Sequence, residues 1–155
     1  MNTDEIYHSL TLIFSERDLL LLHFLATSYM MGLISFVQIV HYPLFKQVGS
    51  EAHLAYHRAH VYWTTWAVGP AMITEALSTS LLCLSPTLPM ELTYSGGLIL
   101  TIIWLSTATL QVPCHNRLSK GFNSAVHTRL VQSNWIRSIG WFLRALIALS
   151  LLRGH

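Results

Sequence analysis

The chain has 155 residues, of which 52% are hydrophobic and only 10% are charged, and its formal net charge is +2. Its mean hydropathy of +0.46 is far above that of an ordinary soluble domain. This composition excludes a typical soluble globular protein and predicts a single integral membrane domain, 1–155, made of helices. The small positive charge requires no nucleic-acid partner, because basic loops beside an anionic membrane face account for it.

Four stretches are long and apolar enough for helices that cross a bilayer, each of which needs about 20 such residues. The predicted spans are about 19–45, 59–84, 92–113 and 130–152. Glu75, Arg137 and Arg144 are the only acidic or basic side chains within them, histidine aside. The predicted fold class is therefore all-α, a transmembrane four-helix up-down bundle.

Residues that cap or bend helices support this layout. Ser15 and Asp18 resemble a capping box that opens the first span. Pro70 predicts a kink inside the second span, and Pro113 is expected to bend or end the third. Apolar residues before the first span recur at helical spacing, as in a short N-terminal helix on the membrane surface, with a frayed tail as the alternative: Ile6, Leu10, Ile13 and Phe14.

Nine of the residues are histidines, and most of them fall at one end of the predicted bundle. In up-down order the end of the first span, the start of the second, the end of the third and the start of the fourth share one face. Six histidines lie there: His41, His53, His57, His60, His115 and His127. Because neutral imidazole is the commonest metal ligand in proteins, this convergence predicts a metal or haem site.

The spacing of the histidines indicates which of them share a helix face. His53, His57 and His60 fall at i, i+4 and i+7, so one face of the second helix presents all three. His53 lies one turn from the helix start, where exposure to solvent is the simpler interpretation. The predicted metal ligands are His41, His57, His60, His115 and His127. Side-chain amides on the same faces are predicted to bind the cofactor by orienting its ligands or a bound water: Gln38, Gln111 and Asn134.

The ligand types restrict the cofactor. Paired Glu-x-x-His motifs are absent, which argues against the carboxylate di-iron centre of soluble bundles. A histidine-rich set favours a transition metal, namely copper, iron or zinc, or else a haem. The simpler alternative is that these histidines lie at the level of the lipid headgroups and contact only water and phosphate.

A second polar layer lies deeper in the predicted bundle. Glu75 and Arg144 should each lie about 22 to 26 Å from the histidine level, and His23 reaches a similar depth. Opposite charges at one depth most simply pair, because an unpaired charge in the bilayer interior costs at least about 3 kcal/mol. The role of this predicted pair is either structural or catalytic, as a proton relay or an anchor for substrate. Tyr62, or alternatively Tyr56, is a further catalytic candidate as a proton donor.

Four segments resemble those of known proteins: FVQIVHYPLFKQVG, AYHRAHVYWTTWAVGPAMITEA, WLSTATLQVPCHNRLSKGF and LVQSNWIRSIGWFLRA. Over about residues 20–147 the chain resembles a group of small bacterial four-span membrane proteins. Those proteins are remotely similar in size and layout to the anthrone-oxygenase-like membrane proteins, which oxidise aromatic polyketides. The resemblance implies an oxygen-using redox enzyme of the bacterial inner membrane, and it gives no individual residue a role.

The basic residues predict an orientation. Most of them lie in or beside the connections between spans one and two and between spans three and four: Lys46, Arg58, Arg117, Lys120, Arg129 and Arg137. The opposite side has only Arg17 and Arg153. Under the positive-inside rule the histidine-rich loops are cytoplasmic and both termini lie outside.

These features together predict an integral membrane protein that binds a metal or haem and acts as an oxidoreductase on a lipophilic substrate. Two alternatives stay open: a non-enzymatic cofactor-binding subunit of a larger membrane complex, and a small metal-ion or proton transporter that works as an oligomer. The expected partners are membrane lipids, a lipophilic small molecule, and further copies or subunits, with no nucleic acid. The sequence contains no nucleophile triad, phosphate-binding loop or dinucleotide fingerprint.

Overall fold

The computed structural model describes residues 15–155, and in this range the chain forms four long helical rods. The first comprises helix α2 (Glu16–Phe36), the π-helical turn η1 (Val37–His41) and α3 (Tyr42–Phe45). The second is the single helix α4 (Ser50–Cys83). The third comprises α5 (Met90–Ser106), the π-helical turn η2 (Thr107–Gln111) and α6 (Val112–Leu118), and the fourth is α7 (Ser124–Gly154). The surface helix predicted around Ile6–Phe14 lies outside the described residues.

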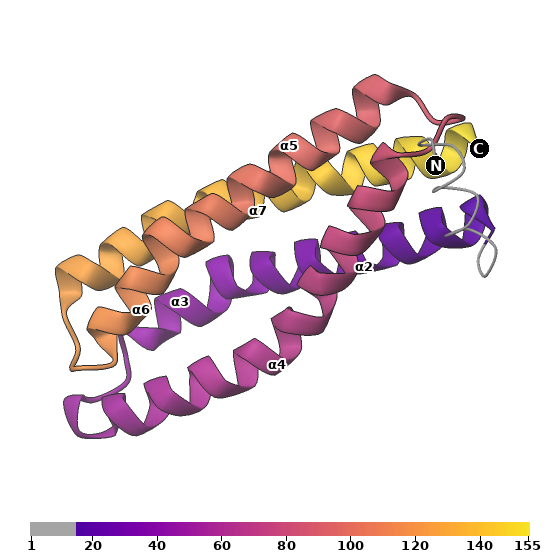
Figure 1. Ribbon diagram of the computed structural model, residues 1–155. Helices are drawn as coiled ribbons and strands as arrows, with labels where there is room; N and C mark the ends of the chain where they lie inside the picture. Colours follow the sequence, from indigo (N-terminus) through magenta and orange to yellow (C-terminus); the bar gives the residue numbers. More distant parts are fainter. Residues whose placement is uncertain (1–14) are drawn as a thin grey trace.

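The rods pack as an all-α four-helix bundle, as predicted. Helix α2 packs against α4 and α7, and α5 packs against the same two helices. The α3–α4 and α6–α7 connections lie at one end, and the α4–α5 connection and the C-terminus lie at the other (Figure 1). This alternation gathers the segments that carry the histidines at one end of the molecule. We call it the histidine end.

The start of α2 confirms the predicted capping box. The Asp18 amide donates to Ser15 Oγ over 3.2 Å, and the Ser15 amide donates to Asp18 Oδ2 over 3.3 Å. Helix α4 contains Pro70 and bends near its middle, as predicted (Figure 1). The bend tilts its first half away from the rest of the bundle, because a proline inside a helix cannot donate the usual hydrogen bond.

Two other prolines, Pro43 and Pro113, each follow a π-helical turn within a rod. Pro113 does not end the third rod, because the π-helical turn η2 precedes it and the helix continues through α6. Pro43 follows η1 in the same way. In both turns the closing bond spans five residues, from the Tyr42 amide to the Val37 carbonyl and from the Val112 amide to the Thr107 carbonyl. The wider turn relieves the clash between a proline ring and the preceding turn, and such turns are frequent at functional sites.

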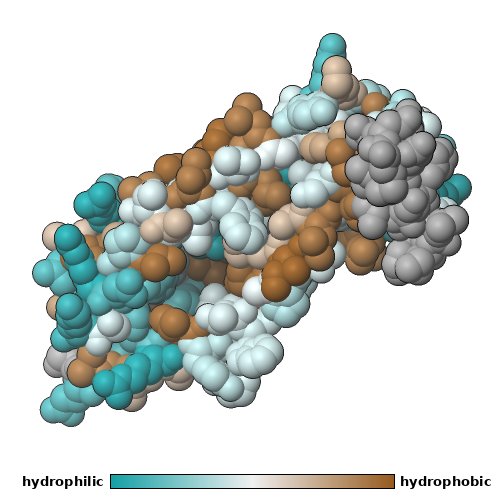
Figure 2. Space-filling model, viewed as in Figure 1, coloured by the Kyte–Doolittle hydropathy of each residue, from teal (hydrophilic) through white to brown (hydrophobic). Residues whose placement is uncertain are grey.

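The distribution of side chains is inverted relative to a soluble protein. Apolar side chains lie on the outside, with Leu25, Leu77 and Leu98 each 63% exposed. Charged and polar side chains are buried, including Glu75 at 0% and Arg144 at 1% exposure. Hydrophobic surface runs along the middle of the visible face, and hydrophilic atoms gather at the histidine end (Figure 2). This is the pattern expected when lipid surrounds the bundle.

Three rods among the described residues are long and apolar enough to cross a membrane: Glu16–Phe45, Met90–Leu118 and Ser124–Gly154. Helix α4 has 34 residues and is long enough, but Gly69, Pro70, Glu75 and several hydroxyl residues reduce its apolar content below that of the other three. The fourth crossing therefore stays a prediction.

Candidate functional site

Four of the predicted ligands form one group at the histidine end. His41 comes from η1, His57 and His60 come from α4, and His115 comes from α6. The rings of His57 and His115 have centroids 5.5 Å apart, and those of His60 and His115 are 5.6 Å apart. His41 stacks on His60 with centroids separated by 4.4 Å. We call these four residues the imidazole cluster.

The nitrogen atoms of the cluster are only partly satisfied. His57 Nε2 and His115 Nδ1 are 3.3 Å apart, and His115 Nε2 is 3.4 Å from the Tyr42 hydroxyl. His41 Nε2 and His57 Nδ1 are buried and have no hydrogen-bond partner within residues 15–155. Burial lowers the pKa of His57, and the His53 imidazole lowers it further, so this ring is held neutral with a lone pair available. Unpaired buried polar atoms are rare in folded proteins and require an explanation.

The fit to a metal ion is partial. In residues 15–155 no group of three or more His, Cys, Asp or Glu side chains is arranged closely enough to hold a metal ion. The stacking of His41 on His60 is one reason, because two parallel rings do not direct nitrogens at a shared point. The 3.3 Å between His57 Nε2 and His115 Nδ1 nevertheless matches the edge, about 3.3 Å, of a tetrahedron with metal–nitrogen bonds near 2.0–2.1 Å. The two nitrogens form a hydrogen-bonded pair, so a metal ion would require both rings to turn toward a shared point and a third side chain to rotate toward it.

His127 lies apart from the imidazole cluster, contrary to its prediction as one ligand of a common set. Phe45 stands between them, with its ring 5.7 Å from that of His127 and 5.9 Å from that of His57. His127 Nε2 is 3.0 Å from the Tyr42 carbonyl oxygen. A carbonyl only accepts hydrogen bonds, so Nε2 carries the proton and the buried Nδ1, which has no partner, keeps its lone pair.

His53 is not exposed, as its position one turn into the helix suggested, but 1% accessible. Its Nε2 donates to the Leu118 carbonyl over 3.1 Å, and its buried Nδ1 has no partner. The i, i+4 spacing to His57 was the signal that placed it on the inner face. Tyr42 is a further residue of the site that the sequence pattern does not single out. Its hydroxyl lies 3.4 Å from His115 Nε2, but in the sequence it is only the neighbour of His41.

The three predicted side-chain amides are buried next to the cluster, but their hydrogen bonds are with one another and with polar groups of neighbouring helices rather than with the histidines. Asn134 Nδ2 donates to Gln38 Oε1 over 2.8 Å. Gln111 Nε2 donates to Ser133 Oγ over 3.0 Å, and its Oε1 accepts from Ser106 over 3.1 Å. Among the described residues no hydrogen bond joins these amides to an imidazole. They link the first, third and fourth rods beneath the cluster, so an orienting role for them stays a prediction.

Three cavities lie along the side of the bundle where α4 faces the third rod. The outer cavity, about 540 Å³, is lined by His57, His115 and the predicted proton donor Tyr62, whose side chain is 56% exposed. The inner cavity, about 220 Å³, is lined by His60 and His115 together with Arg137. The two cavities share wall residues, namely Val61, Thr65, His115 and Asn116.

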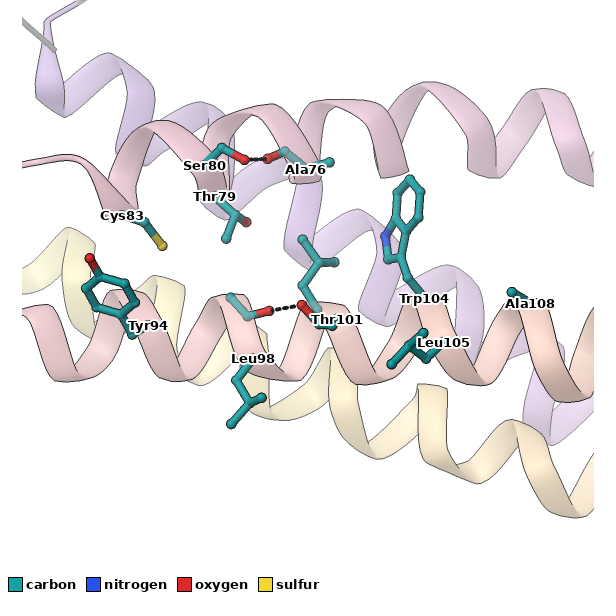
Figure 3. A pocket seen from close by; sticks show the side chains of 12 residues that line it. Ala76, Thr79, Ser80, Cys83, Tyr94, Leu98, Thr101, Trp104, Leu105 and Ala108 are labelled. Carbon is teal, nitrogen blue, oxygen red and sulfur yellow. Dashed lines mark hydrogen bonds between the residues drawn. The ribbon is translucent and has the colours of Figure 1, made fainter. Parts of the chain in front are cut away.

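A third and largest cavity, about 770 Å³, continues along the same two helices toward the opposite end. Figure 3 shows its lining side chains projecting from α4 and α5, with Trp104 toward the histidine end and Cys83 and Tyr94 toward the other. Two of its hydroxyls bond to backbone within their own helices, since Ser80 donates to the Ala76 carbonyl and Thr101 to the Gly97 carbonyl (Figure 3). The remaining surface is mostly apolar and suits a lipophilic molecule or lipid chain.

The second polar layer is built around an ion pair, as its depth predicted. Arg144 Nε donates to Glu75 Oε2 over 3.2 Å, and the two side chains form a buried salt bridge. Arg144 also donates to the Gly96 carbonyl and, over 2.8 Å, to Thr79 Oγ1. The other carboxylate oxygen of Glu75 accepts from Thr27. One residue or more from each of α2, α4, α5 and α7 takes part, so the pair ties all four rods together.

His23 completes this layer. Its Nδ1 lies 2.9 Å from Ser78 Oγ and 3.9 Å from Glu75 Oε1. Because the charges and donors of Glu75 and Arg144 are satisfied within the bundle, the geometry supports a structural role for the pair more directly than the predicted catalytic one.

The chain matches no protein-family model, and comparison with curated proteins and with solved structures yields no match either.

Proposed function

We propose that the protein is a membrane-embedded oxidoreductase that holds a transition metal ion at the imidazole cluster and acts on a lipophilic substrate. The observation that carries the proposal is the gathering of four imidazoles from three rods, with His57 Nε2 and His115 Nδ1 facing each other over 3.3 Å. Neutral imidazole is the commonest metal ligand in proteins, and rings gathered from several helices are a usual way to build such a site.

His57 and His115 are the first ligands in this proposal, because their facing nitrogens already have the separation expected of two ligands. His60 is the third, since its ring lies 5.6 Å from that of His115. Tyr42 orients His115 through its hydroxyl, as partners outside the ligand set commonly do. A copper or iron ion bound there would supply one-electron and oxygen chemistry, whereas zinc would supply a Lewis acid.

The cavities support access for a lipophilic substrate. The outer and inner cavities both reach His115, and the 770 Å³ cavity lies further along α4 and α5, toward the opposite end. A molecule dissolved in the membrane would enter between these helices, where apolar walls replace lipid chains. Tyr62 lines the outer cavity and would donate a proton there.

The membrane placement of this proposal follows from composition and loop charges. All four rods cross the bacterial inner membrane, and the histidine end, with Lys46 and Lys120 in its connections, faces the cytoplasm. A reporter fused to the α6–α7 connection should then be accessible only from the cytoplasm. Labelling from the outer side would contradict this orientation.

The test of metal binding is direct. The protein is purified in detergent, its metals are measured by elemental analysis, and its optical spectrum is recorded before and after loading with copper, iron or zinc. The His57→Ala/His60→Ala variant should lose the bound metal and keep its helical circular dichroism. The control, His155→Ala at the exposed C-terminus, should bind as the unchanged protein does.

A wild-type protein that folds but takes up none of the three metals would overturn the proposal. A haem spectrum in place of a mononuclear metal, without oxygen uptake in the presence of a reduced lipophilic substrate, would favour the non-enzymatic cofactor-binding subunit instead.

A further inference from the structure

Arg137 is a buried cation without a counter-charge. It lies near the middle of α7, and its side chain is 7% exposed. Within residues 15–155, Glu75 is the only buried acidic residue, and Arg144 occupies it. No ion pair to Arg137 occurs among the described residues. An unpaired charge inside a membrane is costly, so a partner is expected.

The guanidinium is also short of hydrogen bonds. Its Nη1 donates to Asn134 Oδ1 over 3.1 Å, and its Nε is buried with no partner in the part of the chain that the structure describes. Arg144, two helical turns further along the same helix, instead donates to a carboxylate, a carbonyl and a hydroxyl. The guanidinium of Arg144 therefore has acceptors of three kinds, whereas that of Arg137 lacks an acceptor for its Nε.

The missing acceptor has room beside Arg137. Arg137 lines the inner cavity, whose polar wall also includes His60, Gln111 and His115. Four further polar residues complete that polar wall, namely Thr64, Thr65, Thr107 and Asn116, and the apolar part is formed by Val61, Val68, Met72 and Val112. A ligand that matches both walls has one anionic group and an apolar body. The cavity adjoins the outer cavity through shared wall residues, so the body can extend toward the membrane.

We propose that Arg137 binds the carboxylate of a lipophilic molecule held in the inner cavity. This inference rests on the proposed function, because it names a lipophilic carboxylate as the substrate class of that site. A planar guanidinium matches a carboxylate, which accepts two parallel hydrogen bonds, and the Nε of Arg137 has no acceptor among the described residues. One negative charge also balances the single cation, whereas a phosphate dianion would leave an excess of charge in the cavity.

The placement puts the bound acid beside the imidazole cluster. His60 and His115 line the same cavity as Arg137, so the carbon chain next to the carboxylate lies against these rings. Arg137 is thus a positioning residue. Asn134 holds its Nη1 and leaves the remainder of the guanidinium for the ligand.

The experiment uses metal-free full-length protein in nanodiscs of neutral lipid, with a diazirine-labelled dodecanoic acid as the probe and its methyl ester as the uncharged control. After photolysis, mass spectrometry locates the attached probe, and unlabelled dodecanoate competes for it. We expect attachment to residues that line the inner cavity, with apparent affinity for the acid about tenfold or more above that for the ester. Arg137→Gln should abolish this preference, Arg137→Lys should keep part of it, and the exposed Arg129→Gln should keep all of it.

Equal attachment of acid and ester to the unchanged protein would overturn the proposal, and so would an unchanged preference in a folded Arg137→Gln variant. The ratio of acid to ester on the unchanged protein decides the matter even where a variant fails to fold. Because no metal is present, failure of this site and failure of the metal site are seen separately.

Discussion

Replacing Glu75 by Gln would leave the Arg144 guanidinium buried in the bundle without its counter-charge. Both side chains are almost fully buried, and the carboxylate is the only acidic group that contacts this arginine among the described residues. Removing one partner of a buried ion pair typically lowers the free energy of unfolding by about 3–5 kcal/mol. We expect Glu75→Gln and Arg144→Gln each to lower it by an amount in this range.

The double variant distinguishes a pair from two independent residues. With both charges removed, two amides can bond to each other and to Thr27 and Thr79, so no buried charge is left uncompensated. The loss in the double variant should therefore be smaller than the sum of the single losses by at least about 1 kcal/mol.

The measurement is unfolding by sodium dodecyl sulfate in mixed micelles, followed by circular dichroism, with the exposed Arg129→Gln as the control on the same helix. Losses that add in the double variant would refute the pairing. Single variants that keep full stability but lose activity would refute the structural role and restore the catalytic one.

Two further predictions concern other parts of the bundle. Lowering the pH from about 7.5 to 5 should reduce the free energy of unfolding. The reason is that the pKa of His57 is lowered in the fold, so the unfolded chain binds the proton more readily. In the same assay the stability of His57→Ala should depend less on pH. Gly140→Ala should lower the free energy of unfolding by about 1–3 kcal/mol, because the added Cβ would lie 2.7 Å from Cγ1 of the fully buried Ile103. Gly32→Ala, where nothing lies within 4 Å of the added Cβ, should leave stability unchanged or slightly raised, and an equal loss at both glycines would contradict the close approach of α5 and α7.

The bundle could be predicted from the sequence because lipid imposes a simple pattern. A run of about 20 apolar residues has few folded alternatives, and up-down order follows when the connections are short. The Glu75–Arg144 pair could be predicted for the same reason, since the helix rise fixes the depth of each residue. The capping box at Ser15 and Asp18 is local and depends on nothing else in the fold.

The candidate site could be predicted only in part, because its details depend on features that spacing does not encode. The regular period of 3.6 residues fails at η1 and η2, where π-helical turns rotate the side chains of His41 and Gln111 relative to a regular helix. Phe45 separates His127 from the imidazole cluster, and no pattern in the sequence indicates that it does. The sequence does not indicate that Arg137 lacks a counter-charge, because this depends on Glu75 pairing with Arg144 instead.

The most direct test of the imidazole cluster as a metal site is the X-ray absorption spectrum of the protein loaded with one equivalent of copper. We expect at least two imidazole nitrogens at about 2.0 Å from the metal. The number of nitrogen ligands should fall by one in His115→Ala and stay the same in His155→Ala. A spectrum with oxygen ligands alone, or one that His115→Ala leaves unchanged, would contradict this expectation.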